Sequence, residues 1–216
     1  IITIPDEDLI IVRTGLIRGK NIILPEKYEH NKAYINKYKY KLREQEEGGG
    51  EEGGLKKLKT NALISIDFGK KKFPKFDIYN PLSFDLETCL LELDEEFRPY
   101  FRAAVGNYQI TLNAQNEFNK SLLNIEKISK LMSDHHDFLK NDLKITTPEI
   151  DHMIDIAEQN GSLASKIVGS GGGGSIVCLS NNKETSTKIL NKFNEIGVKE
   201  AFIAKRGSGP KIIINE

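Results

Sequence analysis

Five of the six residues at positions 169–174 are glycine, and only Ser170 interrupts the run. Glycine has no Cβ, so its backbone adopts positive φ angles and allows a ligand or another segment to approach closely. Such a loop can direct several backbone N–H groups toward one point, and phosphate is the anion that these groups most often bind. A flexible hairpin tip is the alternative interpretation. The candidate residues for binding a phosphate group are Gly169, Ser170, Gly171, Gly172, Gly173 and Gly174.

The residues around this loop exclude two familiar phosphate motifs. A Walker loop requires Gly-Lys-Ser/Thr running into a helix, whereas Gly174 is followed by Ser175-Ile176-Val177, which is typical of a strand. A dinucleotide fingerprint also requires a helix after the loop, with an acidic residue about 20 positions further on. The glycine loop therefore connects two predicted strands.

The elements around the loop predict an α+β fold, an antiparallel sheet with helices on one face. Thr146-Thr147-Pro148 is a typical helix start and Asn160-Gly161 a typical helix end. A second helix is expected from about Lys183 to Ile196, closed by Gly197. The expected strands are 165–168, 175–179, 201–203 and 211–214.

The preceding part of the chain is less regular. We expect a strand at 9–12, a second strand at 62–68, and mainly helix over 84–133, interrupted at Pro99. Glutamate and glycine dominate 44–54 and predict a flexible linker. The Lys70–Lys72 run is expected in a solvated loop.

Composition excludes some classes of partner. The 31 Lys and Arg residues balance 31 Asp and Glu residues, so no net positive charge favours binding to nucleic acid. No apolar run approaches the roughly 20 residues of a membrane-spanning helix, so we expect no membrane partner. Two cysteines are too few for a disulfide framework and favour a reducing, cytoplasmic location. The absence of an initiator Met suggests the downstream part of a longer protein.

Residues 166–177, Lys-Ile-Val-Gly-Ser-Gly-Gly-Gly-Gly-Ser-Ile-Val, resemble the third conserved motif of the GHMP kinases. That motif reads Lys/Arg-x-x-Gly-x-Gly-Gly-Gly-Gly and is followed by a strand. Three more segments resemble the galactokinase-like branch of this superfamily. They are Met132–Leu139 with Thr147–Asp151, the Leu9–Gly15 segment, and Tyr38–Glu47.

The resemblance implies an ATP- and Mg²⁺-dependent kinase that phosphorylates a sugar hydroxyl, and a ferredoxin-like C-terminal domain. The loop 169–174 would border the nucleotide phosphates, while Thr14, Gly15 and Tyr38 would contact the substrate. Lys166, which opens the motif, would have a structural or long-range electrostatic role. The first two motifs of the family and its catalytic aspartate are missing from this sequence, so we assign no catalytic residue.

The resemblance also predicts a division of the chain. Residues 1–80 would be a remnant of the N-terminal and inter-domain region, and 81–216 the C-terminal GHMP kinase domain. The upstream half of the kinase would then be a required partner. The isolated chain is expected to be inactive. Mevalonate-type kinases and a non-catalytic ligand-binding or regulatory module on the same scaffold remain alternatives.

Two adjacent histidines, His135 and His136, stand beside Asp134 and Asp137, a composition that suggests a metal site. Neighbouring residues of a helix point about 100° apart and do not converge on one ion. We therefore predict surface or capping histidines and no metal ligand. Cys178 alternates within a predicted buried strand and is expected in the core.

Overall fold

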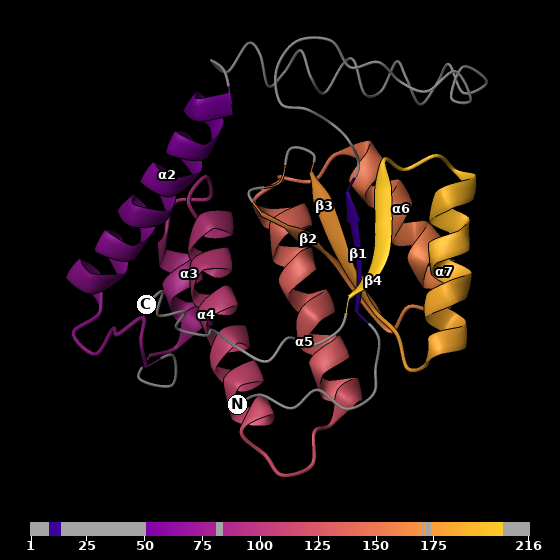
Figure 1. The fold of residues 1–216 in the computed structure, drawn as a ribbon. Helices are drawn as coiled ribbons and strands as arrows, with labels where there is room; N and C mark the ends of the chain where they lie inside the picture. Colours follow the sequence, from indigo (N-terminus) through magenta and orange to yellow (C-terminus); the bar gives the residue numbers. More distant parts are fainter. Residues whose placement is uncertain (1–8, 14–50, 81–83, 170, 172–173, 205–216) are drawn as a thin grey trace, which may run out of the picture.

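A computed structural model describes residues 9–13, 51–80, 84–169, 171 and 174–204 (Figure 1). The predicted strand at 211–214 lies outside these residues. In chain order the elements are β1 (Leu9–Arg13), α2 (Glu51–Lys72), α3 (Leu86–Glu92), α4 (Arg98–Phe118), α5 (Ile125–Asp137), the π-helical turn η3 (Phe138–Asp142), α6 (Pro148–Gln159), β2 (Ala164–Val168), β3 (Ser175–Leu179), α7 (Lys183–Glu195) and β4 (Glu200–Ala204).

The four strands form one antiparallel sheet in the order β2-β3-β1-β4. Helices α6 and α7 pack against the sheet, and α5 lies along β2 (Figure 1). The predicted α+β class with an antiparallel sheet is therefore confirmed. β1 lies between β3 and β4, so the sheet includes strands from both sides of the boundary that we predicted between residues 80 and 81.

The core beneath the sheet is aliphatic. Side chains of α6, β2, β3 and α7 interleave there, and each fully buried one contributes about 1.5–3 kcal/mol relative to an exposed position. Cys178 is among them, as its alternation in the strand predicted. The buried residues of this cluster are Leu139, Ile150, Met153, Ile154, Ala157, Ile167, Ile176, Cys178, Ile189 and Phe193.

A second core, rich in aromatic side chains, lies among α2, α3 and α4. Phe101 of α4 is fully buried, and its ring centroid lies 5.6 Å from that of Phe76 in a stacked arrangement. Phe84 packs on Phe76 at 4.6 Å. Such pairs add about 0.5–1.5 kcal/mol to the burial of the rings themselves.

The strand predicted at 62–68 is wrong, because these residues lie within α2. Small residues form the buried face of this helix: Ser65 is inaccessible and Gly69 contacts Phe76 and Phe101 closely. The apolar side chains of Leu63 and Ile64 point to solvent instead, with exposed fractions of 57% and 45%. A pattern read from hydrophobicity alone therefore placed the buried face incorrectly.

Two neighbouring predictions change with α2. Glu51–Gly54, the end of the predicted linker, forms the first turn of this helix, and 44–50 lie outside the described residues. Lys70–Lys72 are exposed as expected, but they form the last helical turn, where cations favour the negative end of the helix dipole. Lys72 also pairs with Glu92 of α3 at 2.9 Å.

The predicted starts and ends of the later helices are confirmed. Thr147 is the N-cap of α6 and its hydroxyl accepts a hydrogen bond from the backbone N–H of Ile150. Pro99 and Pro148 stand in the first turns of α4 and α6. Gly161 and Gly197 follow α6 and α7 with φ of 100° and 75°, where glycine is favoured.

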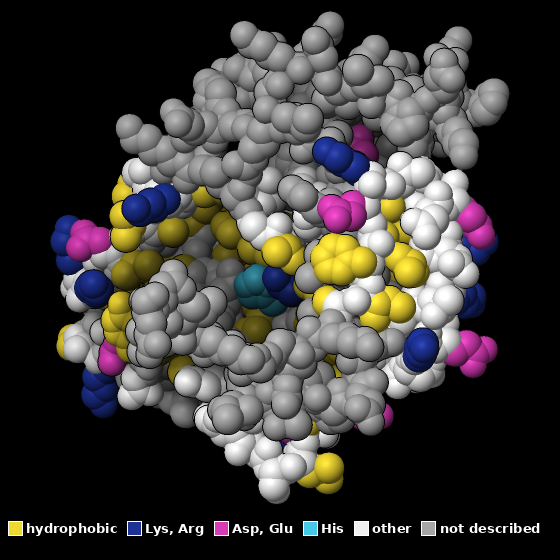
Figure 2. Space-filling view, viewed as in Figure 1, with side chains coloured by type: hydrophobic (Ala, Val, Ile, Leu, Met, Phe, Trp, Pro, Cys, Tyr) yellow, Lys and Arg dark blue, Asp and Glu magenta, His cyan; other side chains and the backbone are white. Residues whose placement is uncertain are grey.

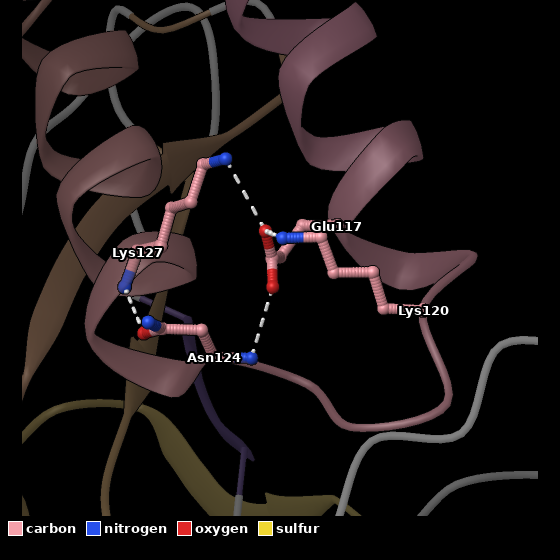
Figure 3. Close-up of polar contacts among 4 residues, drawn as sticks. All are labelled: Glu117, Lys120, Asn124 and Lys127. Atoms are coloured by element: carbon pink, nitrogen blue, oxygen red, sulfur yellow. Dashed lines mark hydrogen bonds and ion pairs between the residues drawn. The ribbon is translucent and has the colours of Figure 1, made fainter.

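A buried carboxylate fixes the turn from α4 to α5 (Figure 3). Glu117 accepts hydrogen bonds from Lys120 Nζ at 2.7 Å and from the backbone N–H of Asn124 at 3.1 Å. Lys127 Nζ lies 3.3 Å from the same carboxylate. The Asn124 side chain caps α5 through the Lys127 backbone N–H. These contacts, that from Lys120 foremost, hold the pKa of Glu117 at about 2.

Candidate functional site

The glycine loop connects β2 to β3, and the last pair before it joins Val168 to Ser175. The structure describes Gly169, Gly171 and Gly174, whose φ angles are 91°, 77° and 97°. All three lie in the region that side chains disfavour, so the sequence needs glycine at these positions. Ser170, Gly172 and Gly173 lie outside the described residues.

Gly171 packs against the body of the protein. It is buried, and a Cβ at this position would overlap the backbone carbonyl oxygen of Ile145. Ile145 stands just before Thr147, the N-cap of α6, so the loop rests on the segment that leads into that helix. A free hairpin tip would lack such a contact. By contrast, a Cβ at Gly169 or Gly174 would meet no atom within 4 Å.

Lys166 lies on β2, three residues before the loop. Its side chain is half-buried, and its Nζ donates a hydrogen bond to the backbone carbonyl of Ile167 at 2.7 Å. Burial lowers the pKa of this ammonium. The structural or electrostatic role of Lys166 is compatible with this geometry and stays a prediction.

The paired histidines are not both on the surface. His136 is only 6% exposed, and neither of its ring nitrogens has a hydrogen-bond partner. The predicted surface or capping position is therefore wrong for His136, because it is buried on α5, which packs along β2. His135 is half-buried, and its Nδ1 is buried without a partner. Burial lowers the pKa of both imidazoles, and that of His135 to about 4.

The surface is hollowed near this region. Figure 2 shows histidine and basic side chains side by side within a hollow, with apolar side chains around them. α5 and β2, which carry His135 and Lys166, lie in the middle of the molecule in the same view (Figure 1). The structure thus brings together residues from two separate motifs of the sequence.

A pocket of about 390 Å³ lies between α4 and α5, and the sequence did not predict it. Arg102 of α4 reaches Asp142 of η3 here, with Nε donating to Oδ2 at 3.0 Å. Gly106 allows the ring of Phe138 to lie directly against α4. Residues that are distant in sequence form this pocket, so no local motif could have indicated it.

The predicted substrate residues Thr14, Gly15 and Tyr38 lie outside the described residues and stay predictions. Among the residues that the structure does describe, no group of three or more His, Cys, Asp or Glu side chains is placed to hold a metal ion. No helix in the described part of the chain is long and apolar enough to cross a membrane.

Known proteins share this fold and sequence pattern. Residues 118–199 match the family model described as GHMP kinases C terminal. The galactokinase of Mannheimia succiniciproducens is 34% identical over 122 residues, which are 54% of this chain and 31% of that protein. The mevalonate kinase of Methanocaldococcus jannaschii is 37% identical over 70 residues, which are 32% of this chain and 22% of that protein.

A solved structure agrees with these relatives. The galactokinase of Lactococcus lactis, crystallised with galactose, has a TM-score of 0.56 and 22% identity, and the match covers 96% of this chain and 47% of that one. Residues 118–199 therefore match a GHMP kinase C-terminal domain. Within that superfamily the relatives support the galactokinase-like branch, which confirms the resemblance seen in the sequence. The chain spans about a third to a half of the length of these galactokinases.

Proposed function

We propose that this chain is the C-terminal part of an ATP-dependent kinase that phosphorylates a sugar hydroxyl, as galactokinases do. The observation that carries the proposal is the glycine loop, which matches the third motif of the family and connects two paired strands. Gly169, Gly171 and Gly174 in this loop have positive φ. The loop is held by backbone packing at Gly171. This contact fixes the backbone at Gly171, and a phosphate site with preorganised backbone groups loses less entropy on binding.

Phosphoryl transfer depends on positioning and on electrostatic stabilisation of the transferring group. In this proposal, the backbone of residues 169–174 borders the nucleotide phosphates, because glycine lets them approach without a side chain between. ATP supplies the phosphoryl group. The described residues offer no cluster of metal ligands, so we assign Mg²⁺ no ligand in this part of the chain. An upstream half would supply the phosphate-binding motif and the catalytic aspartate.

A matched pair of glycine variants tests the role of the loop. Gly174→Val and Gly197→Val both place a side chain at positive φ (97° and 75°) in open space, but only Gly174 belongs to the loop. In the full-length protein, we expect Gly174→Val to lower kcat/KM for ATP by about tenfold or more, as loss of phosphate-contacting groups does. Gly197→Val should stay within about twofold of wild type. Equal effects of both variants would overturn the role of the loop.

The division of the active site needs a separate measurement. The purified 216-residue chain should release no ADP with galactose or mevalonate, whereas the full-length protein should phosphorylate one of them. Measurable turnover by the chain alone would overturn the proposed division. Phosphorylation of galactose by the full-length protein would support the proposal that it is a sugar kinase.

Mevalonate is the second candidate substrate, because a mevalonate kinase also matches part of this chain. If the full-length protein binds ATP but phosphorylates neither compound, the non-catalytic module is the better account. We further propose a cytoplasmic location, since Cys89 and Cys178 are both free and buried.

A further inference from the structure

Lys166 carries a charge that the described part of the protein does not neutralise. Its half-buried ammonium donates to the carbonyl of Ile167, an uncharged acceptor, at 2.7 Å. No carboxylate of the described residues lies within 4.0 Å of it as an ion-pair partner. Partly buried cations are normally paired, because their loss of hydration is otherwise uncompensated. An unpaired one therefore indicates a site for an anion.

The neighbouring side chain adds a donor of the same kind. His135 lies on α5, which packs along β2, and its Nδ1 is buried without a hydrogen-bond partner. The charges that act on His135 are those of Lys166 and His136, and both lower its pKa further after burial has done so. Lys166 is thus the charged group outside α5 that acts on the pKa of His135.

The acidic groups of this region act elsewhere. Asp134 on α5 pairs with Lys130 at 3.0 Å, and Asp151 on α6 lies 3.5 Å from Lys140. Asp151 and Asp137 act on the pKa of His136, the next residue along α5, as do Lys140 and Lys166. Among the described residues, neither Asp134 nor Asp151 forms an ion pair with Lys166.

We propose that Lys166 and His135 form a binding site for a phosphate group at the foot of the glycine loop. A lysine ammonium binds phosphate as a point charge, and an imidazole N–H can donate to a second oxygen. Gly169, three residues after Lys166, has positive φ and leaves space open at the end of the strand. The ligand is inorganic phosphate or a phosphate monoester.

This site goes beyond the proposed kinase function, because it uses side chains of α5 and β2 rather than the loop backbone. It also needs neither an upstream half nor phosphoryl transfer. The two proposals can therefore fail independently: a kinase without this site keeps its turnover, and a non-catalytic module with this site still binds phosphate.

Histidine NMR of the 216-residue chain tests the site with inorganic phosphate as the probe. The pKa of His135 starts at about 4. Saturating phosphate should raise this pKa by about one unit or more, since a nearby anion stabilises the imidazolium. Sodium chloride at matched ionic strength should leave it unchanged. If phosphate has no greater effect on His135 than sodium chloride, the proposal is overturned, whatever the variants show.

A pair of lysine variants assigns the binding to Lys166. Lys166→Met removes the ammonium and keeps the length of the side chain, and we expect phosphate affinity to fall at least tenfold. Lys130→Met removes an exposed lysine on α5 that pairs with Asp134, and it should bind phosphate as wild type does. Equal phosphate affinity of Lys166→Met and wild type would refute the assignment. Circular dichroism establishes that each variant is folded before it is titrated.

A competition experiment with the full-length protein distinguishes the two sources of the phosphate. If the site holds a phosphate of the nucleotide, adenylyl imidodiphosphate should displace inorganic phosphate from His135. If the site holds a free phosphate or a phosphorylated product, both ligands should bind together. Either result supports the site, and absence of phosphate binding in both forms contradicts it.

Discussion

Replacement of the loop glycines by alanine separates two costs that the structure assigns to different positions. Gly169, Gly171 and Gly174 all have positive φ, so each alanine adopts a backbone conformation that costs about 1–2 kcal/mol. Only at Gly171 would the new Cβ overlap another atom, the carbonyl oxygen of Ile145. Overpacking of this kind adds about 1–3 kcal/mol.

The effect of alanine on the unfolded chain is the same for all three variants and cancels when they are compared. Gly171→Ala should therefore lower the free energy of unfolding by about 1–3 kcal/mol more than Gly169→Ala or Gly174→Ala. For a chain of this length each kcal/mol lowers Tm by about 2–4 °C. Urea unfolding followed by circular dichroism, with thermal unfolding beside it, measures the difference.

The result that would refute this reasoning is equal destabilisation by all three variants. It would mean that the loop does not rest on the segment before α6 and that only backbone conformation requires glycine there. A larger loss at Gly169 or Gly174 than at Gly171 would contradict the packing more strongly, because these positions have open space around them.

Two further predictions concern α4. Gly106→Ala should destabilise the protein by about 1–3 kcal/mol, because the Cβ would overlap the ring of Phe138. In a Phe138→Leu background, Gly106→Ala should instead stabilise the protein by up to about 1 kcal/mol through helix propensity. If Gly106→Ala lowers the urea midpoint in both backgrounds, this account of the packing is contradicted. Glu117 has a folded-state pKa of about 2 against an ordinary 4.5, so the unfolded chain takes up the proton first as pH falls. Wild-type stability should therefore decline between about pH 4.5 and 2, and Glu117→Gln should show a flatter profile in that window; parallel urea midpoints of the two proteins would disprove the role of this carboxylate.

The sequence predicted the elements around the glycine loop well, because their signals are local. Thr147 and Pro148 start α6, and Gly161 and Gly197 end the two helices, through contacts within a few residues. β3 alternates in burial from Ser175 to Cys178, whereas in β2 the polar Ser165 is buried and the apolar Val168 is exposed. Much of the candidate site was therefore visible in one continuous motif.

The prediction failed where packing between elements decided the outcome. Ser65 and Gly69 form the buried face of α2 because they let it approach the aromatic core closely, and a hydrophobicity pattern does not detect small residues in that role. His136 was expected near the surface because its helix position alone does not say that it becomes buried where α5 packs along β2.

The sequence by itself determined the glycine motif and its position between two strands. The GHMP kinase resemblance follows from these two features. The tertiary structure decided what surrounds that motif. Ile145 comes to lie against Gly171, and α5, which carries His135, packs along β2, which carries Lys166. The Gly171–Ile145 contact and the packing of α5 on β2 join segments that are far apart in the chain, and their energies depend on close packing, which no local pattern of residues records.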